Sequence, residues 1–280
     1  MLPSFPENPV STRGAILCVM DSRPVGIFDS GVGGLSVLRH FRRLSPQERV
    51  IYFADTAWFP YGPRPAAEVR KRSFAITDRL IAAGCKLIVV ACNTASAAAI
   101  ADLRQAWKIP FVGMVPGVKP ASAASKSGRV VILATDGTFD GDLYARVVDE
   151  FGRRVAIETV PGTGLAELVE RGEAGTAGAR KAVREALARP IAKGADTVVL
   201  GCTHYHFLVE DIEAEFPGLT LIDTSEPVAR RAIQLLEEQD IAAPPRQQGE
   251  LDLIVSGDRA AFKSLMSALG FEPTPQEATR

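Results

Sequence analysis

The chain has 280 residues, of which 46% are hydrophobic and 23% charged, and its formal net charge is −1. These values are typical of a globular protein long enough for two domains. The balanced charge argues against nucleic acid or an anionic membrane as the main partner, and no apolar run is long enough to cross a bilayer. We therefore expect a cytoplasmic protein.

The chain begins with a segment of no periodicity, residues 1–23, which we predict to be a flexible leader. The four cysteines of the chain share no CxxC spacing. We therefore expect free thiols in a reducing compartment and no disulfide framework. A free cysteine is most often a small buried hydrophobe, so a functional role needs a further argument from position.

From residue 24 on, short β-type segments alternate with segments of helical period. The predicted strands are residues 25–28, 50–53, 86–91, 110–113, 129–134, 154–159, 196–201, 219–222 and 251–255. The predicted helices include residues 66–83, 94–107, 142–152, 177–193 and 226–239. Apolar strands such as LIVVA and TVVLG suit a sheet covered on both faces, so the alternation predicts an α/β fold with mostly parallel sheets.

Two distant segments of the chain share one plan. IAAGCKLIVVACNTAS (81–96) aligns with IAKGADTVVLGCTHYH (191–206), and Cys92 then meets Cys202 at an offset of 110 residues. Each segment contains the end of a helix with a glycine, an apolar strand and a cysteine. An internal duplication explains this repeat, and its spacing is that of a domain.

A weaker similarity joins PVGIFDSGVG, near residue 24, to VVILATDGT, near residue 130, and places Ser30 opposite Thr135 or Thr138. We therefore predict two pseudo-symmetric α/β domains with the active site in the cleft between them, because ligands bind beyond the carboxyl ends of parallel strands. The polar residues at such ends are Asp29, Ser30, Asp55, Thr56, Cys92, Asn93, Thr94, Cys202, Thr203 and His204.

A metal site is one interpretation of TVVLGCTHYH (197–206), where Cys202, His204 and His206 stand close together. Zinc needs three or four convergent ligands, and alternate positions after a strand need not converge. The ligand spacings typical of zinc sites are absent as well. We therefore expect no metal.

A nucleotide site is a second interpretation, suggested by the glycine-rich turn in DSGVGGLSVL. Ser36 stands where the dinucleotide-binding fingerprint has its third glycine, and no P-loop lysine is present. The turn can equally permit close packing, or offer helix N-terminal amides to a carboxylate.

A third interpretation uses the repeat itself. Two cysteines at equivalent positions offer one thiol to each face of a small substrate: one thiolate removes a proton, and the other thiol delivers a proton to the opposite face. Asp29 is placed to activate Cys92, and His204 is placed to assist Cys202. A single nucleophilic thiol would leave the second cysteine without a purpose.

Six segments carry a family resemblance: GIFDSGVGGLSVL (26–38), YFADTAWFPYG (52–62), IVVACNTASA (88–97), FVGMVPGVKPA (111–121), ILATDGTF (132–139) and TVVLGCTHY (197–205). Together and in this order they are highly specific. From about Pro24 to at least Ala229 the chain resembles glutamate racemase, of the cofactor-independent aspartate/glutamate racemase superfamily.

The resemblance implies the residues of the site. The two catalytic cysteines of the family fall on Cys92 and Cys202, and its substrate-binding segments fall on Asp29, Ser30, Tyr61, Gly62, Asn93, Thr94, Thr203 and His204. We add Thr138 as a substrate contact from the weaker repeat. Some members use a glutamate near the second cysteine, for which we choose Glu170 over Glu167. For the hydroxyl and amide residues, helix capping is the structural alternative.

The resemblance also implies the domain organisation. The first α/β domain would consist of residues 24–118 together with 227–280, and the second of residues 119–226. Two departures from the family pattern are Pro116, where many members have glutamate, and His206, where many have proline. We assign neither residue to proton transfer, and His206 is interpreted as a packing or rim residue.

The function implied is interconversion of L- and D-glutamate without a cofactor, supplying D-glutamate for peptidoglycan synthesis. The partner expected is therefore a small-molecule substrate, with no nucleic acid and no membrane. A homodimer is possible, and the sequence leaves the oligomeric state open. Two alternatives remain: racemisation of aspartate or a related acid at the same site, and a module that only binds a small molecule between two α/β domains.

Overall fold

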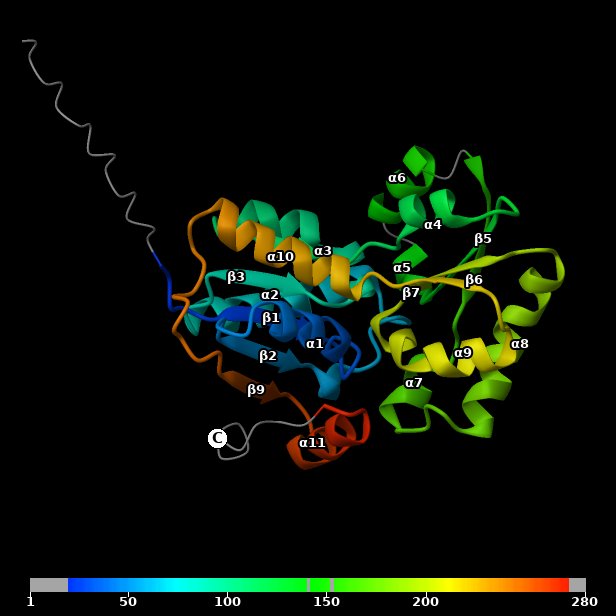
Figure 1. The fold of residues 1–280 in the computed structure, drawn as a ribbon. Helices are drawn as coiled ribbons and strands as arrows, with labels where there is room; N and C mark the ends of the chain where they lie inside the picture. The colour runs from blue at the N-terminus through cyan, green and yellow to red at the C-terminus, as the bar shows by residue number, and fades with distance from the viewer. Residues whose placement is uncertain (1–19, 140–141, 152–153, 272–280) are drawn as a thin grey trace, which may run out of the picture.

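The computed structural model describes residues 20–139, 142–151 and 154–271. Most of the predicted leader, with Cys18, lies outside these residues. Figure 1 shows two lobes side by side, each built on its own sheet. Cys85, Cys92 and Cys202 are free thiols. Among the described residues no helix combines the length and the apolar character needed to cross a membrane.

The first lobe contains a five-stranded sheet. Its strands are, in spatial order, β4 (Phe111–Gly113), β3 (Leu87–Val90), β1 (Val25–Asp29), β2 (Val50–Ala54) and β9 (Leu251–Val255). The helices around it are α1 (Leu35–Leu44), α2 (Ala66–Ala82), α3 (Asn93–Ala106), α10 (Ser225–Glu238) and α11 (Arg259–Ala268), with the short 3₁₀ helix η1 (Thr56–Trp58).

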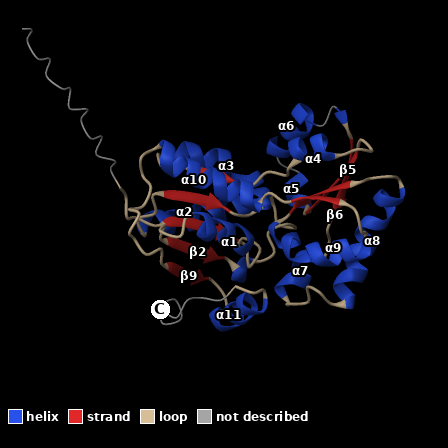
Figure 2. Cartoon of the chain, viewed as in Figure 1, coloured by secondary structure: helices blue, strands red, loops and turns tan. Residues whose placement is uncertain are grey.

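The second lobe contains a four-stranded sheet in the order β6 (Ala156–Pro161), β5 (Arg129–Ala134), β7 (Thr197–Gly201) and β8 (Thr220–Ile222). Its helices are α4 (Val118–Ala124), α5 (Asp136–Phe139), α6 (Asp142–Phe151), α7 (Leu165–Glu170), α8 (Ala177–Ala192) and α9 (Val209–Glu215), with the 3₁₀ helix η3 (Thr203–Leu208). Figure 2 shows helices outside each sheet.

The sequence predicted this architecture correctly. Each of the nine predicted strands is present with ends shifted by at most two residues, and all pairings among the described strands are parallel. The predicted fold class, α/β with two mostly parallel sheets, is confirmed. The domain division after residues 118 and 226 stays a prediction; α10 begins at Ser225, close to the second point, and packs against α1 of the first lobe.

Both faces of the first sheet are buried, which explains why its strands are apolar without alternation. On β1, Val25 and Ile27 pack in the cluster that contains α1 and α10, whereas Phe28 packs with α2 and α3. The first of these clusters continues into the second lobe, where it includes Leu200 and Tyr205. The two lobes therefore share one apolar core beside the cleft.

Candidate active site

The carboxyl ends of β1, β3 and β7 bring the predicted catalytic residues together. Asp29 is the last residue of β1, Cys92 follows β3 after one residue, and Cys202 directly follows β7. The thiol of Cys202 is close enough to Cys92 to act on its pKa. Residues that are 110 positions apart in the sequence thus lie near each other across the two lobes.

The first half of the site contains Cys92 and Asp29, which are both buried. Burial raises the pKa of the Cys92 thiol well above its usual range, and the neighbouring Asp29 carboxyl raises it further. Burial also raises the pKa of Asp29, although the backbone N–H of Gly34 donates to its Oδ2 at 2.8 Å. A carboxylate with a raised pKa is a better base, which suits the partner of a thiol.

The second half of the site is a relay of three side chains. Cys202 Sγ lies 3.7 Å from His204 Nδ1, and His204 Nε2 lies 2.8 Å from Glu170 Oε1. Burial lowers the pKa of His204, but the hydrogen bonds to Cys202 and Glu170 outweigh it, and the net pKa is well above its usual value. A protonated imidazole beside a sulfur stabilises the thiolate. Of the two candidate glutamates, Glu170 is the one that contacts His204.

The glycine-rich turn permits a close approach of the two lobes. The backbone N–H of Val32 donates to Glu170 Oε1 at 2.7 Å. A Cβ atom at Gly31 would overlap with the Glu170 carboxylate, and one at Gly33 would overlap with Thr203 and His204. The glycines are therefore explained by packing against the second lobe, and the space at the turn is filled by catalytic candidates.

The predicted substrate-binding residues lie around this centre. Ser30, Asn93, Thr94, Thr138 and Thr203 are all buried. Within the described residues, neither polar atom of the Asn93 side chain has a hydrogen-bond partner, and the same holds for Asp29 Oδ1. Buried polar groups are normally paired, so these atoms are available to a ligand.

A chain of hydroxyl groups joins the two lobes. Thr94 Oγ1 lies 2.8 Å from Thr135 Oγ1, which lies 3.0 Å from Thr138 Oγ1. Beside it, the N–H of Gly137 donates to the carbonyl of Gly62 at 3.2 Å. The sequence had left Thr135 and Thr138 as alternatives for the position opposite Ser30, and the structure places both in this row of hydroxyl groups.

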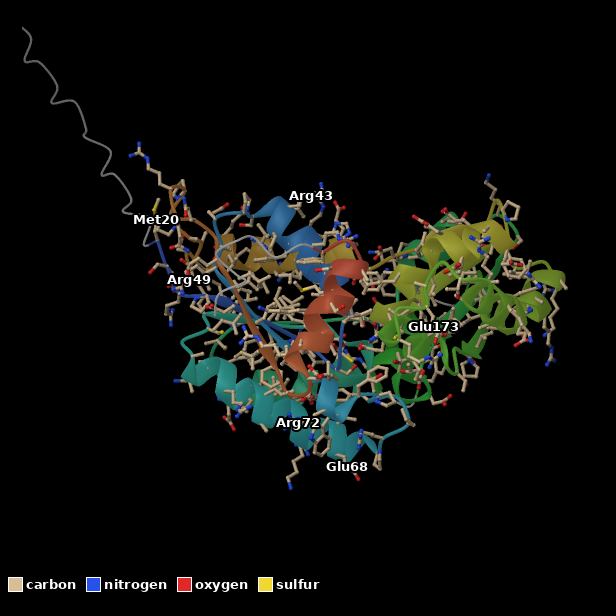
Figure 3. All side chains as sticks on the ribbon, turned by 90° about the horizontal axis from the view of Figure 1, so that it is seen from below. Met20, Arg43, Arg49, Glu68, Arg72 and Glu173 are labelled. Carbon is tan, nitrogen blue, oxygen red and sulfur yellow. The ribbon has the colours of Figure 1, made fainter. Side chains whose placement is uncertain are left out.

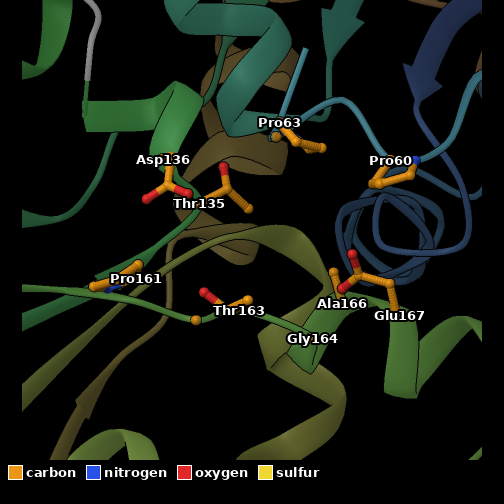
Figure 4. A pocket seen from close by; sticks show the side chains of 11 residues that line it. Pro60, Pro63, Thr135, Asp136, Pro161, Thr163, Gly164, Ala166 and Glu167 are labelled. Atoms are coloured by element: carbon orange, nitrogen blue, oxygen red, sulfur yellow. The ribbon is translucent and has the colours of Figure 1, made fainter.

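A cavity of about 100 Å³ opens beside the site between the lobes. Pro60 and Gly62 line it from the first lobe, and Figure 4 shows Asp136 and Glu167 of the second lobe on opposite sides. Glu167, the alternative glutamate, therefore faces this cavity.

Two predicted features are placed away from the reacting groups. The hydroxyl of Tyr61 donates to Asp55 Oδ2 at 2.5 Å, so this side chain is hydrogen-bonded to Asp55 and not to the reacting groups. His206 has its Nδ1 3.1 Å from Asp223 Oδ1. Within the part of the chain that the structure describes, no group of three or more His, Cys, Asp or Glu residues is arranged to hold a metal ion.

Two parallel α/β lobes, each with a buried thiol at the carboxyl end of a matching strand and beside its own acid/base group, define an isomerase-type site. The chain belongs to the Asp/Glu/Hydantoin racemase family, whose model matches residues 34–232. This confirms the resemblance found in the sequence motifs. The family is also represented by glutamate racemases among the similar proteins.

One such relative is the glutamate racemase of Herpetosiphon aurantiacus, which is 43% identical over 256 residues and is matched over 90% of this chain and 100% of its own length. A solved structure of glutamate racemase from Thermus thermophilus, in complex with β-chloro-D-alanine, has a TM-score of 0.77 and 38% identity, covering 89% of this chain and 94% of that one. The Escherichia coli enzyme, in complex with L-glutamate and an activator, has a TM-score of 0.78 and 34% identity, covering 90% and 97%.

Proposed function

We propose that this protein interconverts L- and D-glutamate by moving a proton at the α-carbon, without a cofactor. The observation that carries the proposal is the pair of buried thiols, Cys92 and Cys202, at equivalent strand ends of two facing lobes. The glutamate racemases to which the chain is similar, one of them in complex with L-glutamate, support glutamate as the substrate.

In this mechanism the two thiols exchange roles between the enantiomers. For one enantiomer Cys92 removes the α-proton and Cys202 delivers a proton to the opposite face; for the other enantiomer the order is reversed. Asp29 accepts the proton of Cys92, which is consistent with its raised pKa. His204, held by Glu170, holds a proton beside Cys202.

The substrate is held by groups that surround the thiols. The unpaired amide of Asn93 and the hydroxyls of Ser30, Thr94, Thr138 and Thr203 offer donors for two carboxylates and acceptors for the ammonium group. Tyr61 and Gly62 contribute through the loop that carries them. The helix that begins at Asn93 directs its first backbone N–H groups toward the same region.

The biological role that follows is the supply of D-glutamate for peptidoglycan synthesis in the cytoplasm. A small-molecule substrate without nucleic acid or membrane agrees with the balanced charge of the chain. We therefore place the protein with cell-wall biogenesis.

The test is incubation with L- or D-glutamate in D₂O without added cofactor. We expect loss of optical activity together with entry of deuterium at the α-carbon. Binding of glutamate without α-proton exchange would favour the alternative of a binding module, and exchange on aspartate alone would favour an aspartate racemase. Activity that is lost with EDTA and restored by zinc would contradict the metal-free mechanism.

A further inference from the structure

A partly buried ion pair lies beside the site, in the first lobe. Arg72 Nε donates to Asp55 Oδ2 at 2.7 Å, and its second nitrogen donates to Oδ1 at 2.5 Å. The Asp55 side chain is fully buried and that of Arg72 is 21% exposed. Figure 3 labels Arg72 on α2. Paired hydrogen bonds between guanidinium and carboxylate fix both position and orientation.

The same carboxylate also holds Tyr61. The Tyr61 hydroxyl donates to Asp55 Oδ2, and burial followed by the charge of Asp55 raises the pKa of Tyr61, which therefore stays protonated and keeps donating. A buried carboxylate needs a compensating charge, and Arg72 supplies it. Without Arg72, Asp55 would be left with a single phenol donor.

These contacts hold one segment, residues 55–64, at its first residue and at Tyr61, and we call this segment the cleft loop. Asp55 begins the loop, and its N–H donates to the carbonyl of Asp29 at 2.9 Å. Arg72 also lies over the ring of Trp58, with its guanidinium carbon 5.2 Å from the ring centroid. The loop is therefore held by Arg72 of α2 and by the end of β1.

The cleft loop in turn touches the second lobe at two points. The ring of Phe59 lies 5.4 Å from the imidazole of His204, measured between centroids. The carbonyl of Gly62 accepts the hydrogen bond from Gly137. The loop thus contacts both the partner of Cys202 and helix α5 of the second lobe, and a displacement of the loop would reach both.

We propose that Arg72 is a positioning residue for the racemisation, acting through Asp55 and Tyr61 to hold the cleft loop against His204 and Gly137. The inference rests on the proposed function. Arg72 itself lies outside the reacting groups, and α2 presents other arginines that do not contact Asp55. One of them, Arg70, pairs with Asp102 at 2.5 Å on the exposed side of the helix.

The experiment compares R72Q, R72K and the control R70Q in the full-length protein, with kcat and KM measured for both glutamate enantiomers. For R72Q we expect kcat to fall by about tenfold to a hundredfold, because a small misplacement of catalytic groups has effects of this size. R72K should recover part of the loss, since lysine supplies the charge but not the two parallel hydrogen bonds. R70Q should resemble the wild type.

Circular dichroism and thermal melts give the folded fraction, so that kcat refers to folded protein. Folded R72Q with the kcat and KM of R70Q would overturn the inference while leaving the racemase function intact. If R72Q does not fold, R72K provides the test. Values of kcat and KM in R72K equal to those of the wild type would then also overturn the inference. A wild type that racemises neither enantiomer would instead overturn the proposed function, and this inference with it.

Discussion

The two cysteine half-sites have the same backbone frame but different chemical surroundings. Each strand is preceded by a helix that ends at a left-handed glycine, Gly84 with φ of 83° and Gly194 with φ of 92°. Each cysteine then adopts an extended conformation, with φ and ψ of −143° and 124° at Cys92 and −140° and 138° at Cys202. The repeat seen in the sequence is therefore matched by equivalent backbone conformations at the two cysteines.

The acid/base groups do not follow the repeat. Asp29, beside Cys92, comes from a neighbouring strand, whereas His204 lies two residues after Cys202 and is supported by Glu170 of α7. The element after Cys92 is a 14-residue α-helix, and the element after Cys202 is a 3₁₀ helix of six residues. The frame supplies symmetry for the two thiols, and unrelated positions supply each thiol with its own partner.

Removal of either thiol should have the largest effect. We expect C92A and C202A each to lower racemisation by about 10⁴-fold, the upper range for an acid/base group. Each variant should still exchange the α-proton of one enantiomer in D₂O, and the two variants should act on opposite enantiomers. Nuclear magnetic resonance of the α-proton, together with optical rotation, measures both.

C85A is the matched control, because Cys85 is also a buried free thiol but lies at the opposite end of β3. It should keep its racemase activity. If C92A and C202A exchanged the same enantiomer, the two thiols could not serve opposite faces.

The next effect separates the two partners. D29N and H204N should each slow racemisation by about 10²-fold, at the lower end for acid/base groups. In D29N the proton transfer at Cys92 becomes limiting, so the primary isotope effect should rise for the α-deuterated enantiomer that faces Cys92 and fall for the other. H204N should give the reverse pattern. Equal isotope effects in both variants would mean that the partners are not specific to one thiol.

The sequence predicted the frame better than the partners. The strands appear in the sequence as apolar runs, and the internal repeat aligns Cys92 with Cys202. The sequence pattern was therefore sufficient to predict the strands and the pair of cysteines. Glu167 and Glu170 are three residues apart on one helix, and only the approach of α7 to the glycine-rich turn distinguishes them. Arg72 and Asp55 are 17 residues apart, and no helical or strand period predicts a contact at that distance.

Substitution of Glu170 tests the relay through its pH dependence. A raised pKa in the folded state means that His204 contributes stability fully below its ordinary value of 6.5 and loses it as the pH rises through the folded value. E170Q removes one of the groups that raise this pKa. The imidazolium should then be lost at lower pH, moving the alkaline limb of kcat in the same direction, and stability below pH 6.5 should fall by about 1–2 kcal/mol.

E167Q serves as the control because Glu167 lies on the same helix and faces the cavity. Its alkaline limb should coincide with that of the wild type. A shift in E167Q equal to that in E170Q would show that general negative charge, and not the contact with His204, sets the pH dependence.

The smallest effect concerns the frame alone. G84A and G194A place a Cβ on a left-handed residue, which costs about 1–2 kcal/mol. A Cβ at Gly84 meets no atom within 4 Å, and one at Gly194 meets Arg129 only at 3.7 Å, so the backbone conformation accounts for the whole cost. The two variants should therefore lose equal stability in urea denaturation while keeping their racemase activity.

At Gly178 the same substitution of glycine by alanine should raise the stability of the protein. It is the second residue of α8 and has no left-handed backbone, and its Cβ would meet Thr176 only at 3.5 Å. G178A should therefore gain about 0.5–1 kcal/mol, because alanine is favoured over glycine in a helix. Unequal losses in G84A and G194A would mean that the two helix ends differ in spite of their matching geometry, and the equivalence of the two half-sites would then be limited to the cysteines themselves.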